Sequence, residues 1–331
     1  MDFLLHHFIE ETVGGLVLGS IYALVALGYT LVYGVLQLIN FAHSEVFMYG
    51  TFAVGWVFVA FKGVDSSASS LWGVLPIVLV ALVAAMLLSA VVALGLERVA
   101  YRPLIKKGAP KLIALISAIG ASFTLSEAMG LRDKIAGWFG LKDDLSNYVG
   151  QARETYSLPV SINPHGLFTI GDYRITDVDL VIIGAALMMM VGLDQFIRRT
   201  RFGRGMRAVA QDPESAALMG VNSTRIIQMT FFLGGLMAGV AACLYMIQVG
   251  STRQDAGFLY GVKAFTAAVL GGIGNLRGAL VGGLVLGVAE IYGGAILGTN
   301  WHDVVAFVLL IVVLLFRPQG LLGEALGKAR A

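Results

Sequence analysis

Residues Gly14–Gly50 read GGLVLGSIYALVALGYTLVYGVLQLINFAHSEVFMYG. The part from Val13 to Ile39 carries no charged residue and exceeds the ~20 residues that a helix needs to cross the hydrocarbon core of a membrane. The polar cluster that follows at once consists of Asn40, His43, Ser44 and Glu45. Such groups are costly at membrane depth unless they face protein or water. We therefore expect a membrane span that leads into a functional site.

The composition of the whole chain indicates a polytopic membrane protein. Hydrophobic residues make up 57% of the sequence and charged residues only 13%, which lies outside the range of soluble globular domains. The 42 glycines favour close helix packing, because small residues let helix backbones approach one another in lipid. The small residues at four-residue spacing are Gly15, Gly19 and Ala23, Gly235 and Gly239, Gly278 and Gly282, and Gly283 and Gly287. We expect them to pack helices rather than to bind a ligand.

The largely uncharged stretches define the candidate membrane spans. These are Val13–Ile39, Val46–Phe61, Leu71–Leu96, Leu112–Leu131, Asp179–Ile197, Ile226–Thr252, Gly257–Leu276, Gly278–Leu297 and Asp303–Phe316. Glu127, Lys263 and Glu290 interrupt three of them. Since several stretches are short for a crossing, we predict an all-α polytopic protein with about nine transmembrane helices, eight and ten being compatible as well. We treat residues 1–331 as one transmembrane domain, with an extracytoplasmic segment and a cytoplasmic loop assigned below.

The distribution of basic residues predicts the orientation of the chain. The loops Glu97–Lys111 and Arg198–Arg225 are basic and are therefore predicted to be cytoplasmic, as is the tail after Phe316 with Lys328 and Arg330. Three spans precede the first basic loop, so the N-terminus is predicted to lie outside and the C-terminus inside.

The segment from residue 132 to 177 is accordingly predicted to be extracytoplasmic. It carries turn signals at Pro159, Asn163-Pro164 and Gly171-Asp172. A small cap or docking surface and a solvated connector are equally compatible with its composition.

Two polar or glycine-rich passages interrupt the apolar pattern, Asn40–Glu45 and Gly271–Arg277 (GGIGNLR). Broken helices of this kind expose backbone groups inside the bilayer, where transporters bind their substrates. Glu45 and Glu290 are candidates for function because an intramembrane carboxylate is costly, although a helix cap would also explain Glu45. For His43 we favour a structural role over a metal or proton-relay role, because the other histidines show no ligand spacing with it.

The sequence contains no motif for catalysis or for a metal. GGIGNLRG lacks the Gly-Lys-Ser/Thr of a phosphate-binding loop, and neither Gly-x-Ser-x-Gly nor His-Glu-x-x-His occurs. The lone Cys243 lies in an apolar run and is expected to be a core residue. We therefore predict no enzyme activity, no metal and no cofactor in this chain.

The second basic loop contains a predicted short helix within Arg207–Gly220. Asp212 can cap it, Pro213 fits its first turn and Gly220 can end it. A cytoplasmic helix beside Arg204 is suited to docking another protein, and contact with anionic lipid headgroups is the alternative.

Five motifs together resemble the LivH-type permeases of branched-chain amino acid ABC importers. They are LINFAHSEVFMYG, ERVAYRPL, LIALISAIG, RFGRGMRAVAQDPESAALMGVN and GVKAFTAAVLGGIGNLRGALVGGLVLGVAE. The resemblance spans nearly the whole chain, and the segment from 132 to 177 is its least typical part. One departure is Ser44, which stands where the family's Asn-Phe-Ala-His-Gly-Glu has glycine and so adds a side chain at a point of close backbone approach.

The resemblance implies a type II importer-like permease in the bacterial inner membrane that carries leucine, isoleucine or valine. Its implied partners are a second LivM-like permease, two ABC ATPase subunits that bind ATP and Mg, a periplasmic amino-acid-binding protein and membrane lipid, with no nucleic acid. The translocation-path residues implied by it are Asn40, His43, Glu45, Gly271, Gly272 and Gly274, to which the intramembrane position adds Glu290. The coupling residues are Arg204, Asp212, Pro213, Glu214, Ala217 and Gly220. A urea or short-amide importer and a passive channel are the alternatives.

Overall fold

The structure is a computed structural model that describes residues 7–62, 67–141, 143, 145–151, 153–170 and 173–323. The turn signal at Gly171-Asp172 and the basic residues Lys328 and Arg330 lie outside the described residues. Within the described part, eight helices are long and apolar enough to cross a membrane, and Ala256–Gly271 is a shorter apolar helix. The prediction of a helical polytopic protein with eight to ten spans is confirmed.

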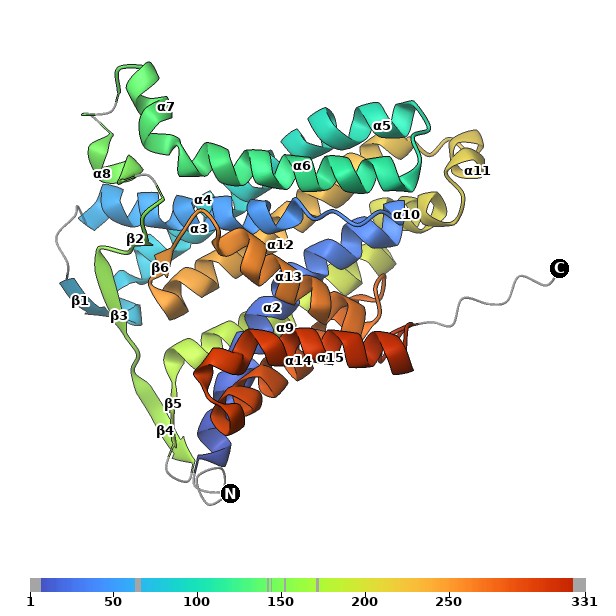
Figure 1. Ribbon diagram of the computed structural model, residues 1–331. Helices are drawn as coiled ribbons and strands as arrows, with labels where there is room; N and C mark the ends of the chain where they lie inside the picture. The colour runs from blue at the N-terminus through green and yellow to red at the C-terminus, as the bar shows by residue number, and fades with distance from the viewer. Residues whose placement is uncertain are drawn as a thin grey trace.

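The long helices correspond closely to the predicted spans (Figure 1). They are α2 (Phe8–Leu36), α3 (His43–Lys62), α4 (Leu71–Leu96), α6 (Lys111–Gly130), α9 (Asp177–Arg199), α12 (Ser223–Val249), α13 (Ala256–Gly271), α14 (Leu276–Leu297) and α15 (His302–Phe316). The first of them begins before the predicted Val13, because Glu10 and Glu11 in its first turn interact favourably with the helix dipole. It ends before Ile39, because Gln37 takes a left-handed conformation with a φ of 51°.

Short elements connect these helices. The helical ones are the π-helical turn η1 (Glu97–Tyr101), α5 (Arg102–Lys106), α7 (Arg132–Trp138), α8 (Ser146–Val149), α10 (Arg201–Gln211), α11 (Pro213–Leu218) and the 3₁₀ turn η2 (Thr299–Trp301). The strands pair as β1 (Ser67–Ser70) with β3 (Val160–Asn163) in parallel, and as β2 (Tyr156–Ser157) with β6 (Ser251–Thr252) and β4 (Gly166–Ile170) with β5 (Tyr173–Thr176) in antiparallel. These short two-stranded sheets are a departure from the all-α expectation.

The core of the bundle is built around α2 and α12, whose most apolar stretches are almost entirely buried. The small residues of α2 pack on α14. A Cβ on Gly19 would lie 2.6 Å from the carbonyl oxygen of Gly283, and one on Gly283 would lie 2.6 Å from the Cβ of Ala23. Gly235 of α12 likewise packs on the backbone of Ala90 in α4. The expected packing role of these small residues is confirmed.

The connecting elements gather at opposite ends of the bundle (Figure 1). α5, α10 and α11 lie at one end, whereas α7, α8 and the strands β1 to β3 lie at the other. At the latter end, the guanidinium of Arg132 donates hydrogen bonds to the carbonyl oxygens of Val149, Met129 and Gln151, and it lies 5.0 Å from the ring centre of Phe52. Arg132 thus links the end of α6 to α8 and to Gln151 just beyond it.

Candidate functional site

The polar cluster between α2 and α3 is buried. Asn40 lies in the turn after α2, and its Oδ1 accepts a hydrogen bond of 2.8 Å from the hydroxyl of Tyr101 in η1. His43 begins α3, and its ring lies edge-on to Tyr29 with the ring centres 4.9 Å apart. Gly28 faces the imidazole, and a Cβ there would overlap the ring. These contacts fit the structural role expected of His43, although its Nε2 has no hydrogen-bond partner among the described residues.

Glu45 lies in the first turn of α3 and is only 1% exposed. Its Oε1 accepts hydrogen bonds from the hydroxyls of Ser122 in α6, at 3.0 Å, and Ser44, at 3.3 Å. Its Oε2 has no hydrogen-bond partner among the described residues and lies against Gly257, where a Cβ would come within 2.6 Å of it. No lysine, arginine or histidine in the described part of the chain forms an ion pair with this carboxylate.

A cavity of about 190 Å³ adjoins this carboxylate. It is lined by Tyr29, Phe41, Ser44, Ile119, Ser122, Phe123, Phe258 and Val262. The two serines that donate to Glu45 are therefore also on the cavity wall, and most of the remaining wall is apolar or aromatic. Such a combination of apolar walls and a few polar groups is typical of small-molecule sites.

Ser44, the departure from the family pattern, is accommodated by Gly261 of α13. A Cβ on Gly261 would overlap the side chain of Ser44, so the absence of a side chain at position 261 leaves the space that Ser44 fills. The serine hydroxyl donates a 2.7 Å hydrogen bond to the carbonyl oxygen of Phe41. The close approach of α13 to α3 is thus retained, because Gly261 on α13 is the residue without a side chain at this contact.

Glu290 lies in a different environment, because it is paired with a lysine. Its Oε1 is 2.6 Å from the Nζ of Lys263, and its Oε2 accepts a 3.0 Å hydrogen bond from Tyr22. Lys263 also lies 2.6 Å from a carboxylate oxygen of Asp303, which is half-exposed at the start of α15. A buried charge is stable only when it is paired. Since Lys263, Glu290 and Asp303 come from α13, α14 and α15, their pairing joins these three helices.

Gly271, Gly272 and Gly274 form the tight turn between α13 and α14, which is called the hinge below. Gly272 and Gly274 have φ values of 106° and 98°, which L side chains rarely adopt. Asn275 caps α14, because its Oδ1 accepts hydrogen bonds from the backbone N–H groups of Arg277, at 3.1 Å, and Gly278, at 3.3 Å. Gly271 packs against the backbone of Gly278, so these glycines serve close approach and turn geometry.

The segment after α15, residues 317–323, closes over this turn and is called the C-terminal strap below. The N–H of Leu321 donates to the carbonyl oxygen of Leu270 at 2.7 Å, and the N–H of Leu322 donates to that of Gly271 at 3.0 Å. The Nδ2 of Asn275 donates to the carbonyl oxygen of Leu322 at 2.8 Å. The hinge is therefore fixed by backbone hydrogen bonds from a remote part of the chain.

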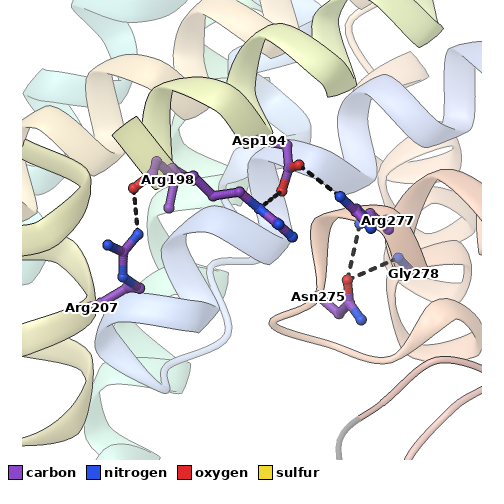
Figure 2. Close-up of polar contacts among 7 residues, drawn as sticks. Asp194, Arg198, Arg207, Asn275, Arg277 and Gly278 are labelled. Atoms are coloured by element: carbon purple, nitrogen blue, oxygen red, sulfur yellow. Dashed lines mark hydrogen bonds and ion pairs between the residues drawn. The ribbon is translucent and has the colours of Figure 1, made fainter. Parts of the chain in front are cut away.

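A polar network on the same side joins the hinge to α9 and α10 (Figure 2). Asp194 of α9 accepts from Arg198 at 2.9 Å and from Arg277 of α14 at 3.2 Å. Arg207 of α10 donates a 2.5 Å hydrogen bond to the carbonyl oxygen of Ile197. The end of α9 thus contacts both the hinge helix α14 and the helix that leads into α11.

The short helix predicted within Arg207–Gly220 is present as α11. Asp212 caps it by accepting hydrogen bonds from the N–H of Glu214, at 2.9 Å, and the hydroxyl of Ser215, at 2.5 Å. These hydrogen bonds, the one from Ser215 foremost, lower the pKa of the Asp212 carboxyl, so the cap is ionised at neutral pH. Gly220 follows the helix with a φ of 84°. The neighbouring Leu218 and Met219 are 89% and 85% exposed, which is unusual for large apolar side chains.

The structure groups the predicted residues in four places. Asn40, His43 and Glu45 lie together at the start of α3, Gly271, Gly272 and Gly274 form the hinge, and Glu290 belongs to the lysine cluster. The residues predicted to couple to the ATPases, Arg204, Asp212, Pro213, Glu214, Ala217 and Gly220, are all exposed on α10, α11 and the turns that flank α11. The residues that sequence reasoning missed as partners are Ser122, Tyr22, Asp303 and Asp194. Of these, only Asp303 could have been found from the sequence. It is a charged residue at the start of a predicted span, and the charged Lys263 within another span favours an ion pair between them.

Comparison with protein families identifies a match that covers most of the chain. The family described as "Branched-chain amino acid transport system / permease component" matches residues 12–314.

Curated relatives resemble the chain over nearly its whole length. The high-affinity branched-chain amino acid transport system permease protein BraD of Pseudomonas aeruginosa is 41% identical, with 97% of each chain covered. LivH of Escherichia coli, which has the same description, is 40% identical, with 96% of each chain covered. Among solved structures, PsaBC from Streptococcus pneumoniae in complex with Fab matches with a TM-score of 0.46 and 11% identity, covering 96% of this chain and 95% of that chain.

Proposed function

The chain belongs to the family of branched-chain amino acid transport system permease components, and we propose that it is a permease subunit of an ATP-driven importer for leucine, isoleucine and valine. The observation that carries the proposal is the similarity to relatives with that description along nearly the entire chain. The buried polar cluster and cavity at the start of α3 support it, because they give the helix bundle a place for a small amphipathic solute.

We propose that this chain works with a second LivM-like permease, two ABC ATPase subunits and a periplasmic amino-acid-binding protein in the bacterial inner membrane. ATP and Mg then belong to the ATPases. In this arrangement the basic loops and the C-terminus face the cytoplasm, and the segment from 132 to 177 faces the binding protein.

The ATPases are proposed to act on α11. Pro213, Glu214 and Ala217 are exposed on α11, and Asp212 caps it. Arg204 on α10 and Gly220 in the turn after α11 are exposed as well. Leu218 and Met219 at the end of α11 supply the apolar area that a protein partner would bury. Movement of α11 and α10 would be passed through the end of α9 and Asp194 to α14 (Figure 2). ATP binding can drive transport in this way only if it favours one of two conformations of the bundle.

The complete importer reconstituted in vesicles tests the proposal by uptake of labelled leucine and labelled urea. We expect leucine uptake that requires the ATPases, ATP and the loaded binding protein. Uptake of urea in place of leucine would identify a short-amide importer. Solute movement at full rate without the ATPases would identify a passive channel, and either result would overturn the proposal.

The coupling role of α11 is tested with Asp212→Lys and Gly220→Trp. Both are expected to reduce leucine uptake and the stimulation of ATPase activity, because they alter the cap and the end of the docking helix, without preventing membrane insertion. The matched control is Glu10→Lys, which reverses the charge of an exposed glutamate in the first turn of α2, away from α10 and α11. Normal uptake in both α11 variants would refute the docking role.

A further inference from the structure

Two of the buried carboxylates, Glu45 and Glu290, differ in how their charge is compensated. Glu290 is 2.6 Å from Lys263, which neutralises it. Glu45 is similarly buried, yet the hydrogen bonds it accepts in the described part of the chain come from the uncharged hydroxyls of Ser44 and Ser122. A buried carboxylate without a cation is unstable unless a positive group is supplied from elsewhere or a proton is taken up.

The environment of Glu45 shows where a positive group could be supplied. α13 closes one side, because Gly257 packs directly on the carboxylate and Gly261 on Ser44. The hydroxyls of Ser44 and Ser122 line the 190 Å³ cavity, to which α13 also contributes Phe258 and Val262. A solute in the cavity would therefore meet the serine oxygens first, with the carboxylate directly behind them.

The hydrogen-bond directions determine what these serines offer to the cavity. The hydroxyl of Ser122 donates its single proton to Glu45, and that of Ser44 has acceptors in both Glu45 and the carbonyl oxygen of Phe41. With the protons so directed, the oxygen lone pairs remain free to accept hydrogen bonds. Hydrogen bonds in a chain polarise one another, so a carboxylate behind a hydroxyl makes its oxygen a stronger acceptor.

We propose that Ser44 and Ser122, polarised by Glu45, bind the ammonium group of the amino acid in transit, a proposal that rests on the proposed transport function. The ammonium group has three donors and a positive charge, which match two hydroxyl acceptors and the uncompensated carboxylate. The branched side chain then packs against the apolar wall formed by residues such as Phe41, Ile119 and Val262. A metal cation fits less well, because Ca²⁺ or Mg²⁺ requires about six or more oxygen ligands and this wall is mostly apolar.

The charge of the cavity can be measured without transport. Cys243 is buried and is the only cysteine of the chain, so a Cys243→Ala background allows a single Ser122→Cys probe. The probe is treated with a cationic aminoethyl and an anionic sulfonatoethyl methanethiosulfonate. Each rate is divided by the rate of the same reagent with a free thiol in solution, because the two reagents differ in intrinsic reactivity. We expect the cationic reagent to be at least about tenfold faster on this scale, as an unscreened charge at short range predicts.

Two further variants assign that preference. Glu45→Gln should abolish it. Glu127→Gln, which removes an exposed carboxylate from the same helix as Ser122, should leave it intact. Equal normalised rates with both reagents would overturn the proposal, and they are the result expected if a lipid chain occupied the cavity or if Glu45 were protonated. A preference that survives Glu45→Gln would also overturn it.

Transport by the complete importer provides the second test. Glu45→Gln and Ser122→Ala are expected to reduce leucine uptake at least about tenfold, the effect of about one lost charge-assisted hydrogen bond, while ATPase stimulation by the loaded binding protein persists. Ser122→Ala keeps the proposal testable if Glu45→Gln fails to fold. If the unmodified importer takes up leucine and these variants do so equally well, the ammonium site is refuted. If the unmodified importer takes up no leucine, the transport function itself is refuted.

Discussion

Lys263 illustrates how a single residue departs from its apolar surroundings for a structural reason. It lies in a run of small and apolar residues in α13, where an isolated charge would be strongly unfavourable. Glu290 and Asp303 each approach it to 2.6 Å, and Tyr22 completes the hydrogen bonding of Glu290. The lysine therefore determines which faces of α13, α14 and α15 meet.

Replacing this lysine should destabilise the protein more than replacing both members of the pair. Lys263→Met leaves Glu290 buried without its cation, and breaking a buried pair in this way costs about 3 to 5 kcal/mol. The double variant Lys263→Met with Glu290→Gln removes the orphaned charge and should recover part of that loss. Thermal unfolding of the purified protein in detergent measures both variants. A single variant as stable as the unmodified protein would show that the pair contributes nothing.

At the scale of helices, the crossing of α2 and α14 depends on small residues placed opposite one another. Gly15 and Gly19 of α2 face Val288 and Gly283 of α14 at distances that leave no room for a side chain. In lipid, close packing of this kind takes the place of the hydrophobic effect as the force that joins helices. The four-residue spacing of the glycines predicted this contact, but it did not identify the partner helix.

A pair of alanine substitutions on α2 tests this crossing. Gly19→Ala would bring a Cβ to 2.6 Å from the carbonyl oxygen of Gly283, so we expect a loss of about 1 to 3 kcal/mol from overpacking. Gly14→Ala lies on the same helix with no atom within 4 Å of the added Cβ, and it should be neutral or slightly stabilising. Unfolding temperatures of the two variants give the comparison, and equal effects would contradict the packing role of Gly19.

The contact between α9 and α14 provides a prediction about coupling. Asp194→Asn removes the charge that holds Arg198 and Arg277, and so weakens the connection between the α10–α11 segment and the hinge. We expect leucine uptake per ATP hydrolysed to fall by about fivefold or more, because allosteric coupling usually changes an affinity by about 5- to 150-fold. Insertion into the membrane should be unchanged. Asp255→Asn, at an exposed aspartate before α13, is the control. An unaltered ratio of uptake to hydrolysis would exclude this route.

The orientation of the whole molecule can be tested by labelling at its two ends. Trp138 and Leu218 are 80% and 89% exposed, on α7 and α11 respectively. The basic loops direct α11 to the cytoplasm, which places α7 at the opposite end of the bundle outside the cell membrane. In intact cells of the Cys243→Ala variant, a membrane-impermeant maleimide should therefore label Trp138→Cys directly. Leu218→Cys should be labelled only after permeabilisation. The reverse pattern would invert the proposed topology and remove α11 from reach of any cytoplasmic ATPase.

The sequence predicted the spans, the exposed helix α11 and the burial of the Asn40–Glu45 cluster, because each depends on local hydropathy or turn chemistry. Helix capping by Asp212 and Gly220 is local in the same sense. The partners of Glu45 and Glu290 could not be predicted, because Ser122 and Lys263 come from other helices whose rotation is determined by packing. Long-range pairing of this kind requires the fold.

The strap of residues 317–323 has a practical consequence for anyone who alters the end of this protein. Because Leu321 and Leu322 donate backbone hydrogen bonds to Leu270 and Gly271, the polypeptide here is a component of the hinge and not a loose appendage. A fluorescent reporter or affinity tag joined within these residues would disturb a bend nearly fifty positions away in sequence. Attachments are therefore best placed beyond Gly323, where the mechanical link is left whole.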